Sequence, residues 1–332
     1  MVNITFKNVG QGDSIIIEWK SKSEEKTAII DCNIFENTNP VLNHIITNNV
    51  KEIEFIILSH PHLDHFSGMY DLIDYCITHN ILIKKFLHTS QITPDYLKSA
   101  TKSIVAEDKL LKLFTFLKEI RDKDLIQINT IEDNSLIKYD FNNGFFMEIL
   151  SPSSIEIDKF IRGVNYPFDE EESSNNPNAN WLSTIIKIYN NNITAILTSD
   201  AESSSFTRIG KKKYNRIGDN KICLAQFPHH GAKGNLNKPF WSQRKRKEIT
   251  PIVVSVGTNG YNHPSDKVID FFNKVGNYKL YRTDFKIISE NKNATSVSQL
   301  LDTISVNITA QLMNNNAGDI IFTLKENTCI RV

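Results

Sequence analysis

Two sequence features that would assign this chain to other classes of protein are missing. The four cysteines lie far apart and form no C-x-x-C pair, which excludes a zinc ribbon and a dithiol redox motif. We interpret them as reduced thiols, which favours the cytoplasm. The 38 basic residues are balanced by 38 acidic residues, so no net field attracts nucleic acid. Any polyanion must therefore be bound by local patches.

Neither a leader nor a membrane span is visible in the sequence. The first residues, MVNITFKNVGQGDS, lack a basic segment followed by an apolar one, so we expect no signal peptide. No apolar run approaches the roughly 18 residues that a transmembrane helix needs. We therefore expect a cytoplasmic protein without membrane contact. With 332 residues, 40% of them apolar, the chain can bury a large core.

Strand and helix patterns alternate along the chain, which is typical of an α/β fold with mixed sheets. Helical spacing of apolar residues predicts one helix over 94–122, and a polar run over 158–180 predicts an irregular connection. The segment STIIKIYNNNITAILTSD, 183–200, predicts a hairpin. Further strands are predicted at 3–9, 14–19, 27–31, 54–59, 145–152, 221–227, 250–257, 303–312 and 318–324.

Polar residues that can bind a metal follow three of the predicted strands. The strands end in Ser59 with His60, Ser199 with Asp200, and Pro228 with His229. In layered α/β folds, binding sites gather where strand ends meet loops. We therefore expect these remote segments to meet at one edge of the sheets.

The densest of these clusters is SHPHLDHF, 59–66. His60 and His62 lie two apart, so in an extended backbone both imidazoles project to one side and reach one ion. Asp64 and His65 follow at the start of a helix and point elsewhere, towards a second ion. Three histidines and an aspartate within six positions favour a metal site over a surface loop that merely contains histidines. A mixed histidine and carboxylate set suits zinc, with manganese or iron as alternatives.

The H-x-H-x-D-H pattern resembles the signature of the metallo-β-lactamase superfamily of hydrolases. Within that superfamily, several segments resemble, in order, the soluble domain of ComEC-like competence proteins, and they are also similar to bacterial phosphorylcholine esterases. The segments are VGQGDSIII, IDC, ILSHPHLDHFSGM, LTSDAE, FPHHGAKG and VSVGTNGYNHPSDKVIDFF. The resemblance runs from residue 4 to about 285.

This resemblance implies a four-layer αββα sandwich with two mixed β-sheets. It also implies one domain over 1–332, made of two internally similar halves at about 1–143 and 144–332. A dinuclear metal site would lie at one edge. The implied ligands are His60 and His62 for the first ion, Asp64 and His65 for the second, and Asp200 as a bridge. Either His229 or His230 would complete the second site, and its neighbour would contact substrate.

By the same resemblance, Asp31 would orient a ligand histidine.

Two positions depart from the superfamily's pattern. The β-lactamases place a third histidine on the first metal from a middle motif, where this chain has NANWLST, 178–184. This agrees with the competence-like branch and argues against β-lactam or thioester hydrolysis. Many competence proteins have an aspartate at the position of His62, so the present chain carries the fuller ligand set.

The ligand set and the resemblance together predict a metal-dependent phosphodiesterase, in the first place a DNA nuclease. Two ions would lower the pKa of a bound water, supply hydroxide and neutralise charge on a phosphoryl oxygen. Asp64 would orient the hydroxide, and His263 would donate a hydrogen bond or proton to the phosphate or the leaving group. Lys233 would bind a phosphate. A turn before a helix explains His263 about as well, and a solvated loop explains Lys233.

Two basic runs, Lys211–Arg216 and Lys238–Lys247, flank the HHG segment. The second interleaves aromatic residues with cations, as surfaces that bind single-stranded DNA do, although solubilising loops are the ordinary alternative. A small phosphodiester, such as a phosphocholine ester or a cyclic nucleotide, is the alternative substrate. A non-catalytic, metal-stabilised module of a bacterial defence or uptake assembly, with a protein partner, is the third hypothesis. Structural zinc sites are normally closed by four protein ligands, whereas this set leaves positions open, which favours an enzyme.

Overall fold

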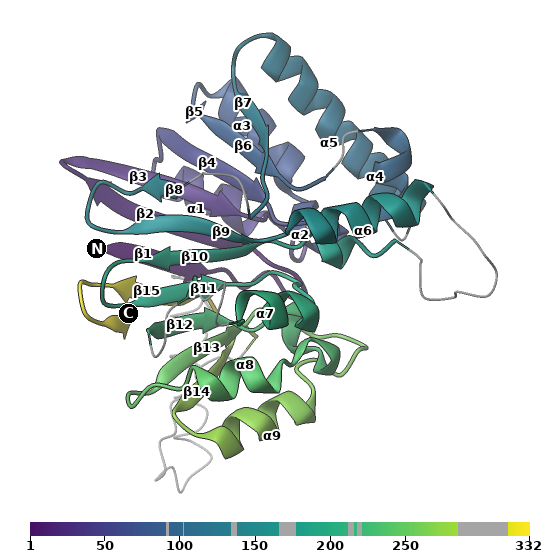
Figure 1. The fold of residues 1–332 in the computed structure, drawn as a ribbon. Coiled ribbons are helices and arrows are strands. Elements are labelled where there is room, and N and C mark those ends of the chain that lie inside the picture. The colour runs from purple at the N-terminus through teal and green to yellow at the C-terminus, as the bar shows by residue number, and fades with distance from the viewer. Residues whose placement is uncertain are drawn as a thin grey trace, which may run out of the picture.

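The computed structural model describes residues 1–90, 93–101, 103–133, 138–165, 177–211, 216–217, 221–284 and 318–332. Two mixed β-sheets lie face to face, and helices cover the outer face of each sheet (Figure 1). The predicted four-layer αββα sandwich is therefore confirmed. The predicted strand at 303–312 lies outside the described residues.

The first sheet has the strand order β16-β15-β1-β2-β3-β4-β6-β7, and β5 pairs with β4. Strands β1, β2 and β3 pair antiparallel, and the strands from β3 to β7 pair parallel. The C-terminal hairpin returns to this sheet, where β15 pairs with β1. The strands are β1 Val2–Phe6, β2 Ile15–Ser21, β3 Glu24–Ile30, β4 Glu52–Leu58, β5 Leu82–Ile83, β6 Lys85–His88, β7 Gln127–Thr130, β15 Ile320–Leu324 and β16 Cys329–Arg331.

The second sheet has the order β14-β13-β12-β11-β10-β9-β8. It repeats the succession of the first sheet, because β8 to β11 pair antiparallel and β11 to β14 pair parallel. The hairpin predicted at 183–200 is present as β10 and β11. The strands are β8 Lys138–Asp140, β9 Phe146–Ser151, β10 Ile185–Tyr189, β11 Thr194–Leu197, β12 Ile222–Gln226, β13 Thr250–Val254 and β14 Tyr278–Arg282.

Helices α1, α3 and α5 cover the first sheet, and α7, α8 and α9 cover the second. None of the described helices is long and apolar enough to cross a membrane. The helices are α1 Pro40–Thr47, α2 Leu63–Phe66, α3 Met69–Thr78, α4 Pro94–Ala100, α5 Ile104–Asp122, α6 Ser154–Asn165, α7 Ser203–Ile209, α8 Lys238–Gln243 and α9 Asp266–Val275, with 3-10 turns η1 Ala179–Leu182, η3 His229–Gly231 and η4 Lys233–Asn235.

Two sequence predictions about these helices are wrong. The single helix predicted over 94–122 is divided into α4 and α5, because Ser103 is extended and its side chain accepts a hydrogen bond from the backbone N–H of Ala106. Such a cap starts a new helix even where the apolar spacing continues. The irregular connection predicted over 158–180 contains most of α6 and the first half of η1. Residues 166–176 of that connection lie outside the described part.

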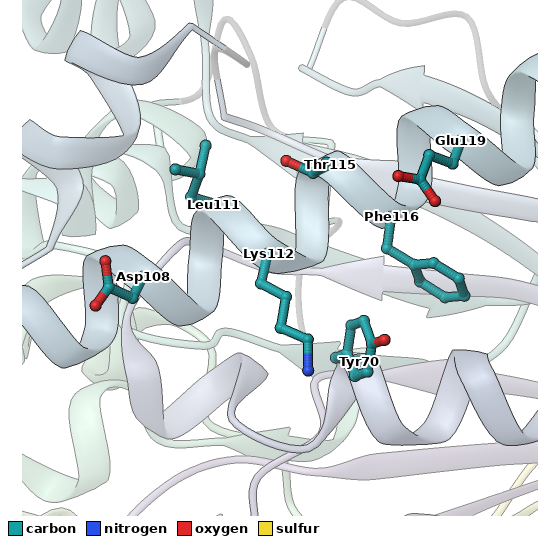
Figure 2. Close-up of a pocket in the computed structure, with 7 residues that line it drawn as sticks. All are labelled: Tyr70, Asp108, Leu111, Lys112, Thr115, Phe116 and Glu119. Carbon is teal, nitrogen blue, oxygen red and sulfur yellow. The ribbon is translucent and has the colours of Figure 1, made fainter.

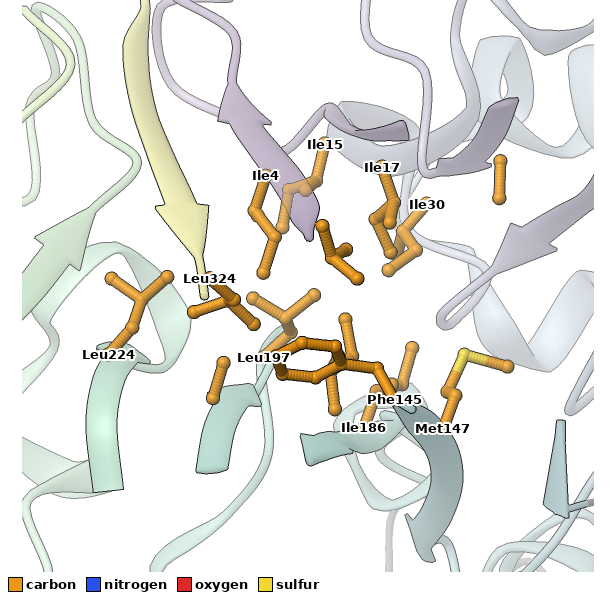
Figure 3. Close-up of a cluster of buried hydrophobic side chains, with 14 of the residues drawn as sticks. Ile4, Ile15, Ile17, Ile30, Phe145, Met147, Ile186, Leu197, Leu224 and Leu324 are labelled. Carbon is orange, nitrogen blue, oxygen red and sulfur yellow. The ribbon is translucent and has the colours of Figure 1, made fainter. Parts of the chain in front are cut away.

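The period-two alternation of the strands produces two separate apolar layers on the first sheet. Ile15 and Ile17 of β2 face the second sheet, whereas Ile16 between them packs under the helices. Between the sheets, side chains from both inner faces interdigitate (Figure 3). This core fixes the two sheets against each other and therefore fixes the relative positions of their edges. Its labelled members in Figure 3 are Ile4, Ile15, Ile17, Ile30, Phe145, Met147, Ile186, Leu197, Leu224 and Leu324.

Phe55 provides a test of this core. Its ring is 1% exposed, and its centroid lies 6.4 Å from that of Trp19 and 5.0 Å from that of Tyr139. We expect Phe55→Ala to lower the free energy of unfolding by about 3–5 kcal/mol, because it removes a buried ring and leaves a cavity. Urea denaturation measures this loss. The control Ile46→Ala, at a side chain 46% exposed on α1, should change stability by less than about 0.5 kcal/mol, and equal effects would contradict the assignment.

Candidate metal centre

The candidate site lies at the carboxyl ends of the parallel strands of both sheets. Asp31 follows β3 and His60 follows β4, each by one or two residues. Asp200 follows β11 in the second sheet, and His229 and His230 follow β12. The three polar segments expected at one edge are therefore brought together there, as their hydrogen bonds and ion pairs show.

One group of side chains surrounds the Oδ1 atom of Asp200. His65 Nε2 lies 3.6 Å from this oxygen, and His230 Nε2 lies 3.7 Å from it. Asp64 closes the group, with its Oδ2 atom 3.2 Å from His230 Nε2 and 3.9 Å from His65 Nε2. We name these four residues the second site.

A different group surrounds the Oδ2 atom of the same carboxylate. His60 Nε2 lies 3.7 Å from this oxygen and 3.0 Å from His62 Nδ1. His229 Nε2 also faces Oδ2, at 3.6 Å. We name His60, His62 and Asp200 the first site, because their ligand atoms all lie within 4.8 Å of one another, a set that does not include His229. His230 thus faces the second site, and His229 lies beside the first.

The donor atoms fit a metal ion in each site. Ligand atoms of a tetrahedral zinc ion, each about 2.0–2.2 Å from the metal, lie roughly 3.3–3.6 Å apart. Most separations above are close to these values. His65 Nε2 and Asp200 Oδ1 are also buried and have no hydrogen-bond partner in the structure. A buried polar atom without a partner costs free energy, and two such atoms 3.6 Å apart are explained by a shared cation. Asp200 would bridge the two ions.

The two histidines of the second site are oriented by hydrogen bonds from the ring nitrogen that points away from the site. His65 Nδ1 donates to Asp31 Oδ2 at 2.7 Å, and His230 Nδ1 donates to the carbonyl oxygen of Ser255 at 2.8 Å. Each bond places the ring proton on Nδ1 and leaves the lone pair of Nε2 facing the site. Asp31 thus has the orienting contact that the resemblance implied, since ligand histidines normally donate their other N–H to a carboxylate or carbonyl.

Charge in the cluster is concentrated on the buried carboxylates. Burial alone would raise the pKa of Asp200, yet the surrounding histidines, led by His230, hold it well below its usual range. Burial alone would lower the pKa of His65, but three carboxylates, led by Asp31, raise it well above its usual value. Burial alone would also lower the pKa of His230, but Asp200 and Asp64 raise it to about 9. The negative charge of the buried carboxylates must therefore be balanced by positive charge. Protons on the histidines or bound divalent cations can supply it.

The backbone at this edge is strained at several non-glycine residues. Asp31, Ser199, His229 and His230 all have positive φ, between 46° and 60°. Such residues cost on the order of 1–3 kcal/mol each and cluster at functional sites. Gly231, with φ +90°, is needed for a close approach, because a Cβ there would lie 2.3 Å from Cβ of Pro264. The HHG turn can therefore lie against the segment that carries His263.

His263 lies beside the first site, and Lys233 lies in η4, shortly after the HHG turn. The rings of His263 and His229 are 5.9 Å apart. Burial, followed by the neighbouring His229 and His230, lowers the pKa of His263, and its Nδ1 atom is buried without a hydrogen-bond partner. Lys233 is exposed in η4, and in the described part of the chain no hydrogen bond or ion pair brings its amine to either site.

Sequence reasoning missed two residues of the centre. Asp13 is 2% exposed and lies in a second carboxylate group with His65 and Asp200. Gln226 donates to Asp13 Oδ1 at 2.9 Å, and its Oε1 accepts from the backbone N–H groups of Thr198 and Ser199. Asp13 lies in VGQGDSIII, and the resemblance of this segment to the competence-like branch was its only sequence signal. No sequence signal marks Gln226.

A separate surface pocket lies on the helices that cover the first sheet. It has a volume of about 350 Å³ and is lined by residues of α3 and α5 (Figure 2). The Lys112 amine lies 3.7 Å from the centroid of the Tyr70 ring there. No residue of either metal site lines this pocket, so it takes no part in the chemistry of the centre.

One family model is similar to the first part of the chain. Residues 8–133 match the model of the Metallo-beta-lactamase superfamily, a superfamily of metal-dependent hydrolases. This match contains Asp31 and the four ligands from His60 to His65, whereas Asp200 and the histidine pair lie beyond it. No curated protein sequence matches the chain significantly.

Several solved structures are similar to this chain at low identity. Zinc-bound PqqB from Methylobacterium extorquens is 9% identical, with 85% of this chain and 98% of that chain covered and a TM-score of 0.43. The metallo-beta-lactamase fold protein YhfI from Bacillus subtilis is 10% identical, with 84% and 96% covered and a TM-score of 0.46. A diphosphatase from the PhnP family is 11% identical, with 85% and 95% covered and a TM-score of 0.43.

Asp31 allows a test of the oriented ligands. Asparagine tolerates the positive φ of this position but removes the charge that accepts from His65. We expect Asp31→Asn to weaken Zn²⁺ binding by about 10–100-fold, as losses of such orienting partners do. Titration of the metal-free protein with zinc measures it. Asp122→Asn, at a carboxylate 55% exposed, is the matched control, and equal affinity of both variants for zinc would refute the role of Asp31.

Proposed function

We propose that this chain, which combines a metallo-β-lactamase superfamily segment with an αββα sandwich, hydrolyses phosphodiester bonds with two divalent ions. Zinc is the first candidate for the metal, and manganese is the alternative. The observation that carries the proposal is the position of Asp200, whose two oxygens face two separate groups of ligand atoms. Sites a few ångströms apart that share one carboxylate are typical of enzymes that displace at phosphorus.

The exposure of the ligands supports catalysis over a purely structural role. His60 and His65 are fully buried, whereas the side chains of Asp64 and His229 are 36% and 29% exposed. A structural zinc site is closed by protein ligands on every side. Here one side of the cluster is open to solvent and therefore to a substrate, which disfavours the non-catalytic module.

When bound, two divalent ions supply a water of low pKa and neutralise charge on the phosphoryl oxygens. In the proposed mechanism Asp64, the more exposed carboxylate of the centre, orients the attacking water. His229, beside the first site, contacts a phosphoryl oxygen. His263, next to His229, donates a hydrogen bond or proton to the leaving group. Lys233 contacts a phosphate that extends beyond the centre.

The resemblance favours DNA as the substrate. One sequence feature that supported DNA, the aromatic residues of the second basic run, is not available for binding. Phe240 and Trp241, the aromatic residues of the second basic run, are 2% and 0% exposed in the core under α8. They cannot stack on bases. Arg244 is buried as well, and its Nη1 donates to the carbonyl oxygen of Phe240. Lys238, Lys245 and Lys247 remain exposed for a phosphate backbone.

Of the first basic run, the structure describes only the two ends, Lys211 and Arg216. Arg216 donates to Glu148 at 2.7 Å and to the backbone at Asp133, which ties it to the second sheet. Lys211 is exposed, and residues 212–215 lie outside the described part. The burial of Phe240, Trp241 and Arg244 favours the second candidate substrate, a small phosphodiester, which needs no extended binding surface.

Hydrolysis of bis(p-nitrophenyl) phosphate tests the reaction. We expect the zinc- or manganese-loaded protein to release nitrophenol, EDTA to abolish the release, and His62→Ala to reduce it at least about 100-fold, because the first site loses a ligand. The matched control is His79→Ala, at an exposed histidine of α3's C-terminal end. Absence of turnover with every divalent metal and phosphodiester tried would refute the proposal.

A comparison of substrates separates the two candidates. If DNA is the substrate, cleavage of single-stranded DNA should fall at least about tenfold in the double variant Lys211→Glu, Lys238→Glu and should weaken steeply with salt. Hydrolysis of the small diester should then stay unchanged in the same variant. If the substrate is small, cyclic nucleotides or phosphocholine esters should be hydrolysed faster than DNA, with no effect of the charge reversal.

A further inference from the structure

Ser199 has a backbone conformation that its residue type does not favour. Its φ is 46°, in the left-handed region, immediately before Asp200. A residue with a side chain pays roughly 1–2 kcal/mol for this conformation, whereas glycine adopts it freely. Serine at such a position is therefore explained only if its side chain makes contacts that glycine cannot make.

The Ser199 hydroxyl makes two such contacts inside the centre. The residue is 4% exposed, and its Oγ lies 2.7 Å from Oγ of Ser59 and 3.1 Å from Nδ1 of His60. Ser59 belongs to the segment after β4 in the first sheet, and Ser199 follows β11 in the second. The pair of hydroxyls therefore joins the two halves of the centre.

The direction of every proton in this contact is determined by the carboxylate at its end. Asp31 Oδ2 can only accept, so Ser59 Oγ donates to it, at 2.6 Å. Because Ser59 donates its only hydroxyl proton to Asp31, Ser59 Oγ accepts the hydrogen bond from Ser199 Oγ. Ser199 has then donated its own hydroxyl proton, so Ser199 Oγ accepts from Nδ1–H of His60. The relay runs from His60 through Ser199 and Ser59 to Asp31.

This relay fixes the tautomer of His60. With the proton held on Nδ1, the lone pair of Nε2 faces Oδ2 of Asp200, as a metal ligand requires. Ser59 Oγ is also 3.3 Å from His60 Nδ1, a longer contact than the 3.1 Å between Ser199 Oγ and the same nitrogen. His65 donates directly to the same oxygen of Asp31 at 2.7 Å. One buried carboxylate thus orients a ligand in each site.

We propose that Ser199 is a positioning residue for the first metal site, which holds His60 in its ligating tautomer through a hydroxyl relay to Asp31. Its effect is local to the first site, because the second-site histidines are oriented by Asp31 directly and by the carbonyl of Ser255. The inference rests on the two cation sites of the proposed function. It does not depend on which substrate is hydrolysed.

The test measures zinc affinity in variants that keep only one site. His230→Ala leaves the first site, and His62→Ala leaves the second. In the His230→Ala background, Ser199→Gly should weaken zinc binding by about 10–100-fold. In the His62→Ala background, the same change should alter zinc affinity by less than about threefold. Isothermal titration of the metal-free proteins with zinc gives both values, and no enzyme activity is needed.

Thermal unfolding separates positioning from a structural role. Ser199→Gly relieves the left-handed strain while it frees the unfolded chain, so the metal-free melting temperature should stay about unchanged. A merely structural serine would instead lower the melting temperature and weaken both sites alike. Ser199→Ala keeps the strain and removes only the hydroxyl, so it should reproduce the loss at the first site and serves if the glycine variant does not fold. Unchanged first-site affinity in either variant, or equal losses in the two backgrounds, would overturn the proposal.

Discussion

The structure of the centre depends on one buried carboxylate that is shared between two groups of histidines. Asp200 is 2% exposed, and its two oxygens face different rings. An ionised carboxylate at such a depth is costly unless positive charge lies within a few ångströms. The histidines alone meet this demand only by taking up protons, and divalent cations meet it while leaving the imidazoles neutral. The unpartnered atoms at the second site are consistent with the second solution.

The αββα sandwich makes this concentration of charge possible. The core between the sheets is mainly apolar, and the candidate ligands gather at the edge where the parallel strands end. Each sheet contributes a part of the ligand set, and neither part is complete alone. The interface of the two halves carries the polar bonds that tie these parts together, among them the contact between Gln226 and Asp13 at 2.9 Å. Stability of the core and geometry of the centre are therefore coupled.

Much of the centre follows from the sequence because its key residues are local. In H-x-H-x-D-H, the spacing of His60 and His62 places both in the first site, and Asp64 and His65 fall in the second, as the extended-then-helical backbone predicts. The sandwich itself was inferred from a resemblance. Alternating strands and helices alone indicate an α/β class and leave the number of layers open.

The remaining features depend on contacts between remote segments, and local spacing does not encode them. The choice between His229 and His230 is made by positive φ angles of 52° and 53°, which turn the two rings to opposite oxygens of Asp200. The basic run with aromatic residues suggested a surface that binds DNA. The spacing of Phe240 and Trp241 fits the buried side of a short helix equally well, and the two rings are buried in α8. A serine in the left-handed region is likewise invisible before the backbone is known.

Anomalous diffraction from crystals soaked in zinc tests the central claim most directly. The account predicts two zinc peaks on opposite oxygens of Asp200. One should lie within reach of His60 and His62, and the other within reach of His65 and His230. A map with no peak between these side chains, or with a single peak that leaves one group of histidines bonded only to water, would contradict it.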